Sequence, residues 1–274
     1  MNLTSPSQVK AWCIEHDFHP NKTMGQNFLI DRNALVAIVD AALAPAAGPD
    51  AGKGAEVLEI GPGLGVLTEE LLARGCRVTA IEKDPVLAAR LADALGNPPG
   101  LRVIEDDALE MIVKGMPDQR FTHMVSNLPY QAGTRMLLEL VKRREIPSMT
   151  VLLQSEVAER LAAKEGSKAR GLAGVWAQLD YDVKIVRKVA AGCFWPRPEV
   201  GSSVATLVRH DRNIGLTAKE REIFRLLTKK AFEHRRKQLG TIFRNMIQST
   251  ARAEELANED WINLSKGLAE NEDT

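Results

Sequence analysis

The chain has 274 residues, of which 45% are hydrophobic and 26% charged, with 36 basic and 36 acidic side chains and a formal net charge of zero. This balance is typical of a globular protein large enough for one α/β domain and a small appendage, and we expect neither a membrane span nor a secretory signal because no long apolar run is present. The three cysteines and five histidines are scattered, so we expect no disulfide framework and no metal site, and a cytoplasmic protein is the default expectation.

The first predicted elements are a helix over 31–44, with Asp31 as its N-cap, and a Gly/Pro/Ala-rich linker over 45–54. Short apolar runs then alternate with amphipathic stretches. We expect strands at 56–60, 78–82, 101–105, 122–127 and 150–154, and helices at 65–74, 85–95 and 132–143. This alternation predicts a doubly wound, mostly parallel sheet with ligand sites at the carboxyl ends of its strands.

Two further apolar runs, 183–189 and 203–208, are expected to add strands at one edge of the sheet. The pattern then becomes helical, with helices expected at 218–233, 236–249 and 259–269. We therefore predict two domains, 1–210 and a small all-α domain over 211–274.

Charge is segregated within this C-terminal part. Residues 219–244 hold nine Lys or Arg against three Glu, a net charge of +6, whereas residues 250–274 hold two basic against seven acidic residues, a net charge of −5. A basic helical stripe favours a polyanion-binding surface. A solvated helix face would show the same charges, so both interpretations remain open.

A glycine-rich turn, Gly61-Pro62-Gly63-Leu64-Gly65, follows the first predicted strand of the sheet. Glycines let the backbone turn sharply and approach a ligand closely. A lone G-x-G-x-G is a weak signal, because nicotinamide enzymes use a related G-x-G-x-x-G pattern. Here position 66 is Val, so the third glycine of that pattern is missing.

Two acids follow the next strands, at positions suited to a nucleoside. Glu82 closes the second strand, where a carboxylate can accept both ribose hydroxyl hydrogens, and Asp107 follows the third, where it can accept from an adenine amino group. The alternative is that both are surface acids at strand ends. Together with the glycine turn, they favour S-adenosylmethionine over a nicotinamide cofactor.

The tetrapeptide Asn127-Leu128-Pro129-Tyr130 follows the fourth strand. The Asn127 carboxamide oxygen and the Leu128 carbonyl can accept the two hydrogens of an exocyclic amino group, most suitably N6 of adenine. Pro129 fixes the turn, and Tyr130 offers a face for the base to stack on. These residues predict methylation of an amino nitrogen by placement and oriented dipoles, without a general base. The alternative is a chance Pro-Tyr turn.

A second aromatic candidate, Phe194, lies in a proline-spaced loop, Phe194-Trp195-Pro196-Arg197-Pro198. It could close over the target base opposite Tyr130. Hydrophobic packing is the alternative for this side chain.

Several motifs together resemble the ribosomal RNA adenine dimethyltransferases of the KsgA/RsmA and Dim type. The segment Gly25-Gln26-Asn27-Phe28-Leu29-Ile30-Asp31 is similar to that family's G-Q-N-F-L-x-D motif. The glycine turn, the 127–130 turn, 153–161, 194–204 and 235–239 are similar to further family blocks. The resemblance covers nearly the whole chain and implies a Rossmann-like class I methyltransferase fold.

The resemblance also implies roles for individual residues. The S-adenosylmethionine pocket would be lined by Gln26, Asn27, Leu29, Gly61, Gly63, Glu82, Asp107 and Asn127, and the target adenine would be held by the 127–130 turn and Phe194. RNA contacts would come from Arg235, Arg236 and Lys237. The implied substrate is two adjacent adenosines in the 3′-terminal hairpin loop of small-subunit ribosomal RNA, in a pre-30S particle, each of which receives two methyl groups. For the oligomeric state, which the sequence does not show, a monomer is the default expectation.

Two alternatives remain open: a large-subunit RNA adenine methyltransferase of the resistance (Erm) type, and a non-catalytic assembly or RNA-binding factor. One segment also departs from the family pattern G-S-K-A-Y-G-R-L-S-V, because Arg170 stands in place of the tyrosine and Gly174 in place of the serine. This departure puts the local RNA contacts in doubt.

Overall fold

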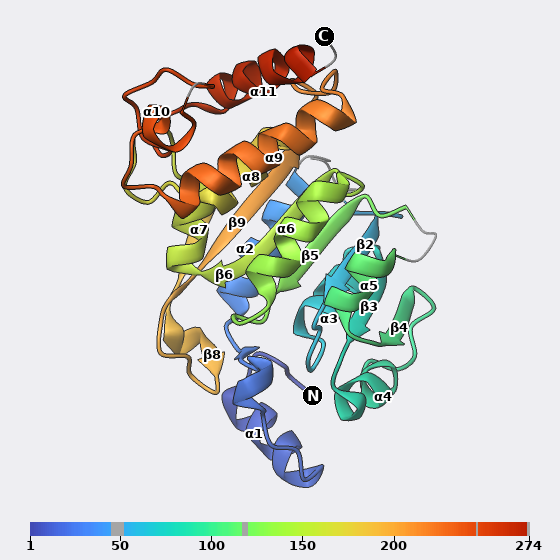
Figure 1. The fold of residues 1–274 in the computed structure, drawn as a ribbon. Coiled ribbons are helices and arrows are strands. Elements are labelled where there is room, and N and C mark those ends of the chain that lie inside the picture. The colour runs from blue at the N-terminus through green and yellow to red at the C-terminus, as the bar shows by residue number, and fades with distance from the viewer. Residues whose placement is uncertain (45–51, 117–119, 245, 273–274) are drawn as a thin grey trace. The chain divides into compact units, whose positions relative to one another are not determined.

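The computed structural model describes residues 1–44, 52–116, 120–244 and 246–272 (Figure 1). Its contacts divide the chain into two compact units. Unit 1 comprises 1–158 and 184–209, and unit 2 comprises 159–183 and 210–274. Unit 2 thus includes the segment 159–183, which packs with the C-terminal helices although it lies within the predicted 1–210 domain. Most of the predicted linker over 45–54 lies outside the described residues.

Unit 1 is built on a seven-stranded sheet of order β4-β3-β2-β5-β6-β9-β7. The strands are β2 Glu56–Ile60, β3 Arg77–Glu82, β4 Leu101–Glu105, β5 His123–Asn127, β6 Ser148–Gln154, β7 Tyr181–Val189 and β9 Ser202–Arg209. β2 to β6 pair in parallel, and β9 runs antiparallel to β6. The seven predicted strands and the mostly parallel sheet are therefore confirmed.

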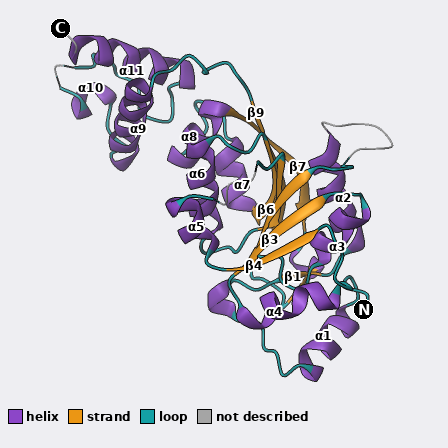
Figure 2. Ribbon diagram, turned by 90° about the vertical axis from the view of Figure 1, so that its right-hand side faces the viewer, coloured by secondary structure: helices purple, strands orange, loops and turns teal. Residues whose placement is uncertain are grey.

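Helices cover both faces of this sheet. α2 (Arg32–Leu43) and α3 (Val66–Ala73) lie on one face, and α5 (Ala108–Lys114) and α6 (Gly133–Arg143) lie on the other (Figure 2). α4 (Pro85–Ala94) packs into the same hydrophobic core as α2 and α3. The predicted helices over 31–44, 65–74, 85–95 and 132–143 are confirmed to within two residues.

Asp31 is the N-cap of α2, as predicted, and its side chain accepts a hydrogen bond of 2.7 Å from the Ala34 amide. Asp84 and Asp107 cap α4 and α5 in the same way. The structure thus places a capping carboxylate directly after β3 and another after β4.

The N-terminal part of unit 1 contains elements that the sequence analysis did not predict. These are α1 (Pro6–Glu15), a 3-10 turn at Lys22–Met24, and a short strand β1 (Phe28–Leu29). β1 pairs antiparallel with β8 (Phe194–Trp195), which follows another 3-10 turn at Ala191–Cys193. This pairing places the 25–31 motif beside the proline-spaced loop that begins at Phe194.

Unit 2 is helical. It contains the second half of α7 (Ser155–Ala162), then α8 (Leu172–Asp180), α9 (Ala218–Glu233), α10 (Leu239–Ile242) and α11 (Asn258–Glu272). Its core is centred on Phe224 and Trp261, both buried. Thr217 and Glu220 form a capping box at the start of α9, so the predicted helix over 218–233 is confirmed. The helix predicted over 259–269 is confirmed as part of α11.

The helix predicted over 236–249 is wrong. Of the residues described there, 236–244 and 246–249, only Leu239–Ile242 is helical, because the amides of Leu239 and Gly240 donate to the carbonyls of Ala251 and Ser249, at 2.8 and 2.9 Å. These hydrogen bonds turn the chain back on itself. A Cβ on Gly240 would lie 2.9 Å from the Ser249 oxygen, so the close approach requires glycine.

The two departures from the family pattern lie inside unit 2. Arg170 is only 1% exposed, and its guanidinium donates to the carbonyl of Ala163 at 3.2 Å and to Asn258 Oδ1 at 2.9 Å. It therefore links the chain just after α7 to the start of α11, and its side chain is too buried to contact RNA. Gly174 lets α8 approach α7 closely, since a Cβ there would lie 2.4 Å from the Arg160 oxygen. Among the described helices, none is both long and apolar enough to cross a membrane.

Candidate nucleotide and methyl-acceptor site

A cavity of about 370 Å³ lies in unit 1 at the carboxyl ends of four parallel strands. Its lining comes from the segment 23–29 and from the turns that follow β2, β3, β4 and β5. The chain proceeds outward from β2 to β4 and then crosses to β5 on the other side of β2. Such a reversal separates two neighbouring strands at their ends, which is where doubly wound sheets bind ligands.

A buried serine marks this point of strand separation. The Ile60 amide at the end of β2 donates to the Ser126 hydroxyl on β5 at 2.8 Å. In the described parts of β2 and β5, only Val57 and Leu58 of β2 pair with β5 through the main chain. The Ser126 hydroxyl therefore accepts from the Ile60 amide, which has no main-chain partner on β5.

The glycine turn forms one wall of the cavity. Gly61 and Gly63 have φ of +65° and +59°, which a residue with a side chain rarely adopts. A Cβ on Gly61 would meet no atom within 4 Å, so it would project into the open space. A Cβ on Gly63 would lie 3.0 Å from the Phe28 ring. Glycine at these positions keeps room for a ligand against the backbone.

Glu82 stands at the end of β3, on the cavity wall. Its two carboxylate oxygens accept from the main-chain amides of Gly63 (3.1 Å) and Asp84 (2.9 Å). The side chain is 6% exposed, and burial raises the pKa of this carboxyl despite those two hydrogen bonds. The carboxylate is thus held in a fixed position, as a ribose-binding group requires.

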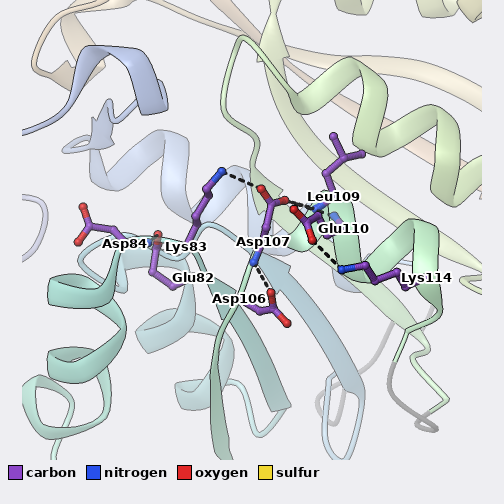
Figure 3. Close-up of polar contacts among 8 residues, drawn as sticks. All are labelled: Glu82, Lys83, Asp84, Asp106, Asp107, Leu109, Glu110 and Lys114. Carbon is purple, nitrogen blue, oxygen red and sulfur yellow. Dashed lines mark hydrogen bonds and ion pairs between the residues drawn. The ribbon is translucent and has the colours of Figure 1, made fainter.

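Asp107 also lines the cavity, but its oxygens already have partners (Figure 3). One forms a 2.7 Å ion pair with Lys83, and the other accepts from the amides of Leu109 and Glu110 at the start of α5. The hydrogen bond from Lys83 lowers the pKa of Asp107. A carboxylate can accept about four hydrogen bonds, so capacity for an adenine amino group remains.

Glu59 is the most perturbed acid at the site. It is 1% exposed and lies near the end of β2, two residues before Gly61, and one of its oxygens accepts from the Thr68 hydroxyl at 2.7 Å. The other oxygen is buried without a partner among the described residues. Burial raises the pKa of Glu59 to about 8, with a further contribution from the nearby Glu82.

The N-terminal motif spans the cavity from one wall to the other. Gln26 donates to Asp84 Oδ2 after β3, at 2.8 Å, and accepts from the Asn21 amide at 2.7 Å. On the other side, the Asn27 carbonyl accepts from Asn127 Nδ2 at 2.9 Å. Leu29 is buried in the lining. The motif is therefore anchored to the ends of both β3 and β5.

The carboxamide of Asn127 has a defined orientation. Because Nδ2 donates to Asn27, Oδ1 is the free end of the group, and no described residue donates to it. The Leu128 amide donates to Leu152, and the Pro129 carbonyl accepts from the Gly133 amide at 2.7 Å. The Leu128 carbonyl has no hydrogen-bond partner among the described residues. Two acceptors thus remain available at the end of β5.

Not all predicted methyl-acceptor residues lie at the cavity itself. Asn127 and Pro129 line it, whereas Leu128, Tyr130 and Phe194 lie outside its lining. Tyr130 is half-buried, and its hydroxyl lies 2.5 Å from the Ser202 hydroxyl. Phe194 is 2% exposed and packs in the hydrophobic core, paired with Leu29 across β1 and β8.

The basic residues predicted for RNA contact lie together in unit 2, but they differ in their surroundings. Arg235 donates to the Lys168 carbonyl at 3.2 Å and lies 3.6 Å from Glu254. Arg236 and Lys237 are exposed. Of the three, Arg235 therefore has protein partners, whereas Arg236 and Lys237 face solvent.

All residues predicted for the cofactor pocket line this one cavity: Gln26, Asn27, Leu29, Gly61, Gly63, Glu82, Asp107 and Asn127. Among residues not predicted, Lys83 lines the cavity, and Asp84, Ser126 and Ser202 form hydrogen bonds to residues of the site. Only Asp84 carries a sequence signal, because Asp before Pro85 is typical of a helix N-terminus. A fixed carboxylate at β3 and a glycine cradle fit a nucleoside ligand, and two free acceptors at β5 fit an amino group.

Comparison with known proteins agrees with this geometry. The family described as Ribosomal RNA adenine dimethylase matches residues 17–269. "Ribosomal RNA small subunit methyltransferase A" from Shouchella clausii is 37% identical, over 91% of this chain and 83% of that protein. The protein of the same name from Deinococcus radiodurans is 43% identical, over 75% of this chain and 67% of that protein.

Solved structures give the same fold. A dimethyladenosine transferase from Plasmodium falciparum superposes with a TM-score of 0.73 at 22% identity, covering 88% of this chain and 96% of that one. The 23S rRNA methyltransferase ErmE superposes with a TM-score of 0.69 at 24% identity, covering 89% and 100%. At these identities the comparison bears on the fold, and the predicted class I methyltransferase fold is confirmed.

Proposed function

The chain belongs to the ribosomal RNA adenine dimethylase family, and from this premise we propose that it dimethylates N6 of two adjacent adenosines near the 3′ end of small-subunit ribosomal RNA. The observation that carries the chemistry is the oriented carboxamide of Asn127, whose free oxygen lies at the end of β5 beside the nucleoside cavity. The named relatives support the small-subunit substrate.

The proposed methyl donor is S-adenosylmethionine, which supplies an electrophilic methyl group on a sulfonium when bound. Glu82 would hold its ribose hydroxyls, Asp107 its adenine amino group, and the backbone at Gly61 and Gly63 would lie against it. The segment with Gln26, Asn27 and Leu29 would cover the pocket. The fixed carboxylate and the open space at Gly61 support this fit.

The residues after β5 act on the target adenine. In the first transfer, Asn127 Oδ1 and the Leu128 carbonyl would accept its two N6 hydrogens, which favours the positive charge that develops on the nitrogen as its bond to the methyl carbon forms and the donor's carbon–sulfur bond breaks. The methylated nitrogen then releases one proton to water. Pro129 directs its own carbonyl to Gly133, so that it does not compete. No side chain has to remove a proton before attack. The base must leave its stack to reach the turn, and a hairpin loop lowers that cost.

Tyr130 would provide the face on which the extruded base stacks. Phe194 supports this region from the core, where its pairing with Leu29 joins the proline-spaced loop to the donor pocket. We propose that its contact with the base requires the loop to move, since the side chain is buried in this structure.

We propose that unit 2 contacts ribosomal RNA through Arg236 and Lys237, within the basic 219–244 segment. Exposed Lys and Arg neutralise phosphates irrespective of sequence, which suits recognition of a folded RNA. Arg235 would fix the position of this segment through its contacts with the Lys168 carbonyl and Glu254. The proposed partner is a pre-30S particle, and the proposed state is a cytoplasmic monomer.

Transfer of labelled methyl groups tests the function. The protein and labelled S-adenosylmethionine are incubated with under-methylated small subunits and, separately, with large-subunit RNA fragments. We expect label in adjacent adenosines near the 3′ end of the small-subunit RNA. Label confined to large-subunit RNA would favour the resistance-type activity, and RNA binding without any label would favour a non-catalytic assembly factor.

A further inference from the structure

The hydroxyl of Tyr130 is bound to a buried side chain from the far side of β6. Its oxygen lies 2.5 Å from Oγ of Ser202, the first residue of β9, which is fully buried. β6 separates β9 from β5, the strand that leads into the turn with Tyr130. The contact therefore reaches across one strand of the sheet and joins residues 72 positions apart.

Ser202 itself is held rigidly. It pairs with Gln154 in the antiparallel register of β6 and β9, and the Ser155 amide donates to the carbonyl of the preceding Gly201 at 3.0 Å. The next residue, Ser203, is equally buried, and its hydroxyl lies 3.0 Å from that of Ser155. A hydroxyl on such a strand end is a fixed point for whatever it binds.

The other end of the tyrosine is fixed as well. Gly25 of the N-terminal motif packs against the turn, since a Cβ there would lie 3.3 Å from the Tyr130 amide nitrogen and 3.3 Å from Pro129 Cβ. With its backbone packed against Gly25 and its hydroxyl bound to Ser202, the ring has little freedom to tilt.

We propose that Ser202 is a positioning residue for methyl transfer: its hydroxyl fixes the direction of the Tyr130 side chain, and so the place of the ring on which the target base stacks. This rests on the proposed function of the 127–130 turn. Ser202 touches neither methyl donor nor base in this role. It acts by holding the hydroxyl end of the ring in one place, so that the stacked base keeps its amino nitrogen in line for attack, and misplacement of a reacting group is costly in rate.

The chain offers a matched set of variants. Ser202→Ala removes the hydroxyl that binds Tyr130, and Tyr130→Phe removes the tyrosine hydroxyl but keeps the ring. Ser203→Ala removes a neighbouring buried hydroxyl, which binds Ser155 and not Tyr130. We expect Ser202→Ala and Tyr130→Phe each to lower kcat by about three- to tenfold with little change in KM for the methyl donor. Ser203→Ala should keep wild-type kcat.

The double variant Ser202→Ala/Tyr130→Phe distinguishes the loss of one shared hydrogen bond from two separate losses of local structure. If both hydroxyls act through one bond, the double variant should be no slower than either single variant. Multiplicative losses in the double variant, or equal losses in Ser202→Ala and Ser203→Ala, would overturn the proposal. An inactive wild-type enzyme would instead contradict the proposed function.

A spectroscopic titration tests the bond without any activity. The chain has only two tyrosines, Tyr130 and Tyr181, so comparison with Tyr130→Phe assigns the ionisation of Tyr130 in the ultraviolet absorbance. Burial raises the pKa of Tyr130, and the hydrogen bond with Ser202 lowers it. Ser202→Ala should therefore shift this ionisation to higher pH, and Ser203→Ala should not. No shift in Ser202→Ala would contradict the anchoring bond.

Discussion

The side-chain amide of Asn127 donates a 2.9 Å hydrogen bond to the main-chain carbonyl of Asn27, one hundred residues earlier in the chain. A carboxamide has a donor end and an acceptor end, and this bond fixes which is which. In the proposed function, the acceptor oxygen is left for the substrate. The N-terminal motif would then both cover the donor pocket and orient the group that binds the target amine.

The first prediction concerns the donor pocket. Glu82→Gln replaces a buried carboxylate, which accepts from Gly63 and Asp84, by a neutral amide that cannot accept at both ends. We expect the dissociation constant for S-adenosylmethionine to rise roughly 10- to 100-fold, because hydrogen bonds to a charged group are worth about 1.5–3 kcal/mol. Isothermal titration calorimetry measures this directly.

Glu105→Gln is the matched control for Glu82→Gln. Glu105 is the register partner of Glu82 on the neighbouring strand β4, but it is exposed and lies outside the cavity lining. Its substitution should leave donor affinity unchanged. Equal affinities for the two variants would contradict the assignment of Glu82.

A second prediction follows from the raised pKa of Glu59. The folded protein keeps this carboxyl protonated up to about pH 8, whereas the unfolded chain releases the proton near the ordinary value of 4.5. The folded state therefore binds more protons between these values, and the free energy of unfolding falls as pH rises through this window. The fall is at most about 1.4 kcal/mol per pH unit from one such group.

Glu59→Gln should remove that part of the pH dependence. Urea unfolding at pH 5.5 and pH 8 should show the variant gaining stability relative to wild type at the higher pH. Glu69→Gln, an exposed change on the following helix α3, should follow the wild-type curve. Parallel curves for wild type and Glu59→Gln would mean that Glu59 is ionised in the folded protein.

Much of unit 1 could be predicted from sequence because its signals are local. Alternating apolar runs predict the seven strands, and the positions of Glu82, Asp107 and Asn127 at or just after the ends of their strands predict that they lie at one edge of the sheet. What the sequence could not provide is pairing between distant segments. The β1–β8 pairing buries Phe194, and the Ser202 contact with Tyr130 has no local signature.

The helices of unit 2 also show that local sequence signals do not predict contacts between distant segments. The capping box at Thr217 and Glu220 marks α9 in the sequence itself. The apolar spacing over 236–249 also favours a helix, but the hydrogen bonds from Leu239 and Gly240 to residues about ten positions later override that local preference. Propensity is a weak guide where the chain folds back on itself.

A third prediction concerns Arg170. Its truncation, Arg170→Ala, leaves a cavity and removes the hydrogen bonds to Ala163 and Asn258. We expect the free energy of unfolding to fall by about 2–4 kcal/mol. Lys168→Ala, an exposed change in the same loop, should be close to neutral. If Arg170→Ala weakened RNA binding while leaving stability intact, the buried structural role would be wrong.

The fourth prediction concerns the RNA-contacting surface. Removing Arg236 and Lys237 together should weaken binding to ribosomal RNA and reduce the salt dependence of the binding constant, with a slope smaller by about 1 for each lost phosphate contact. Filter binding over a range of salt concentrations measures the slope. A double variant of Lys10 and Arg90, two exposed residues of unit 1, removes the same net charge. Equal slopes for both double variants would point to general electrostatics instead of a defined contact.

The most direct test of the central claim is mass spectrometry of small-subunit ribosomal RNA nucleosides. Cells that lack this gene are complemented with the wild-type protein or with Asn127→Ala, at matched protein levels. Because the oriented carboxamide oxygen is lost, we expect transfer to fall at least about 100-fold. N6,N6-dimethyladenosine at adjacent 3′ adenosines should appear with wild type and be absent with Asn127→Ala. Equal dimethylation by both proteins would contradict the role of Asn127, and none with wild type would contradict the proposed reaction.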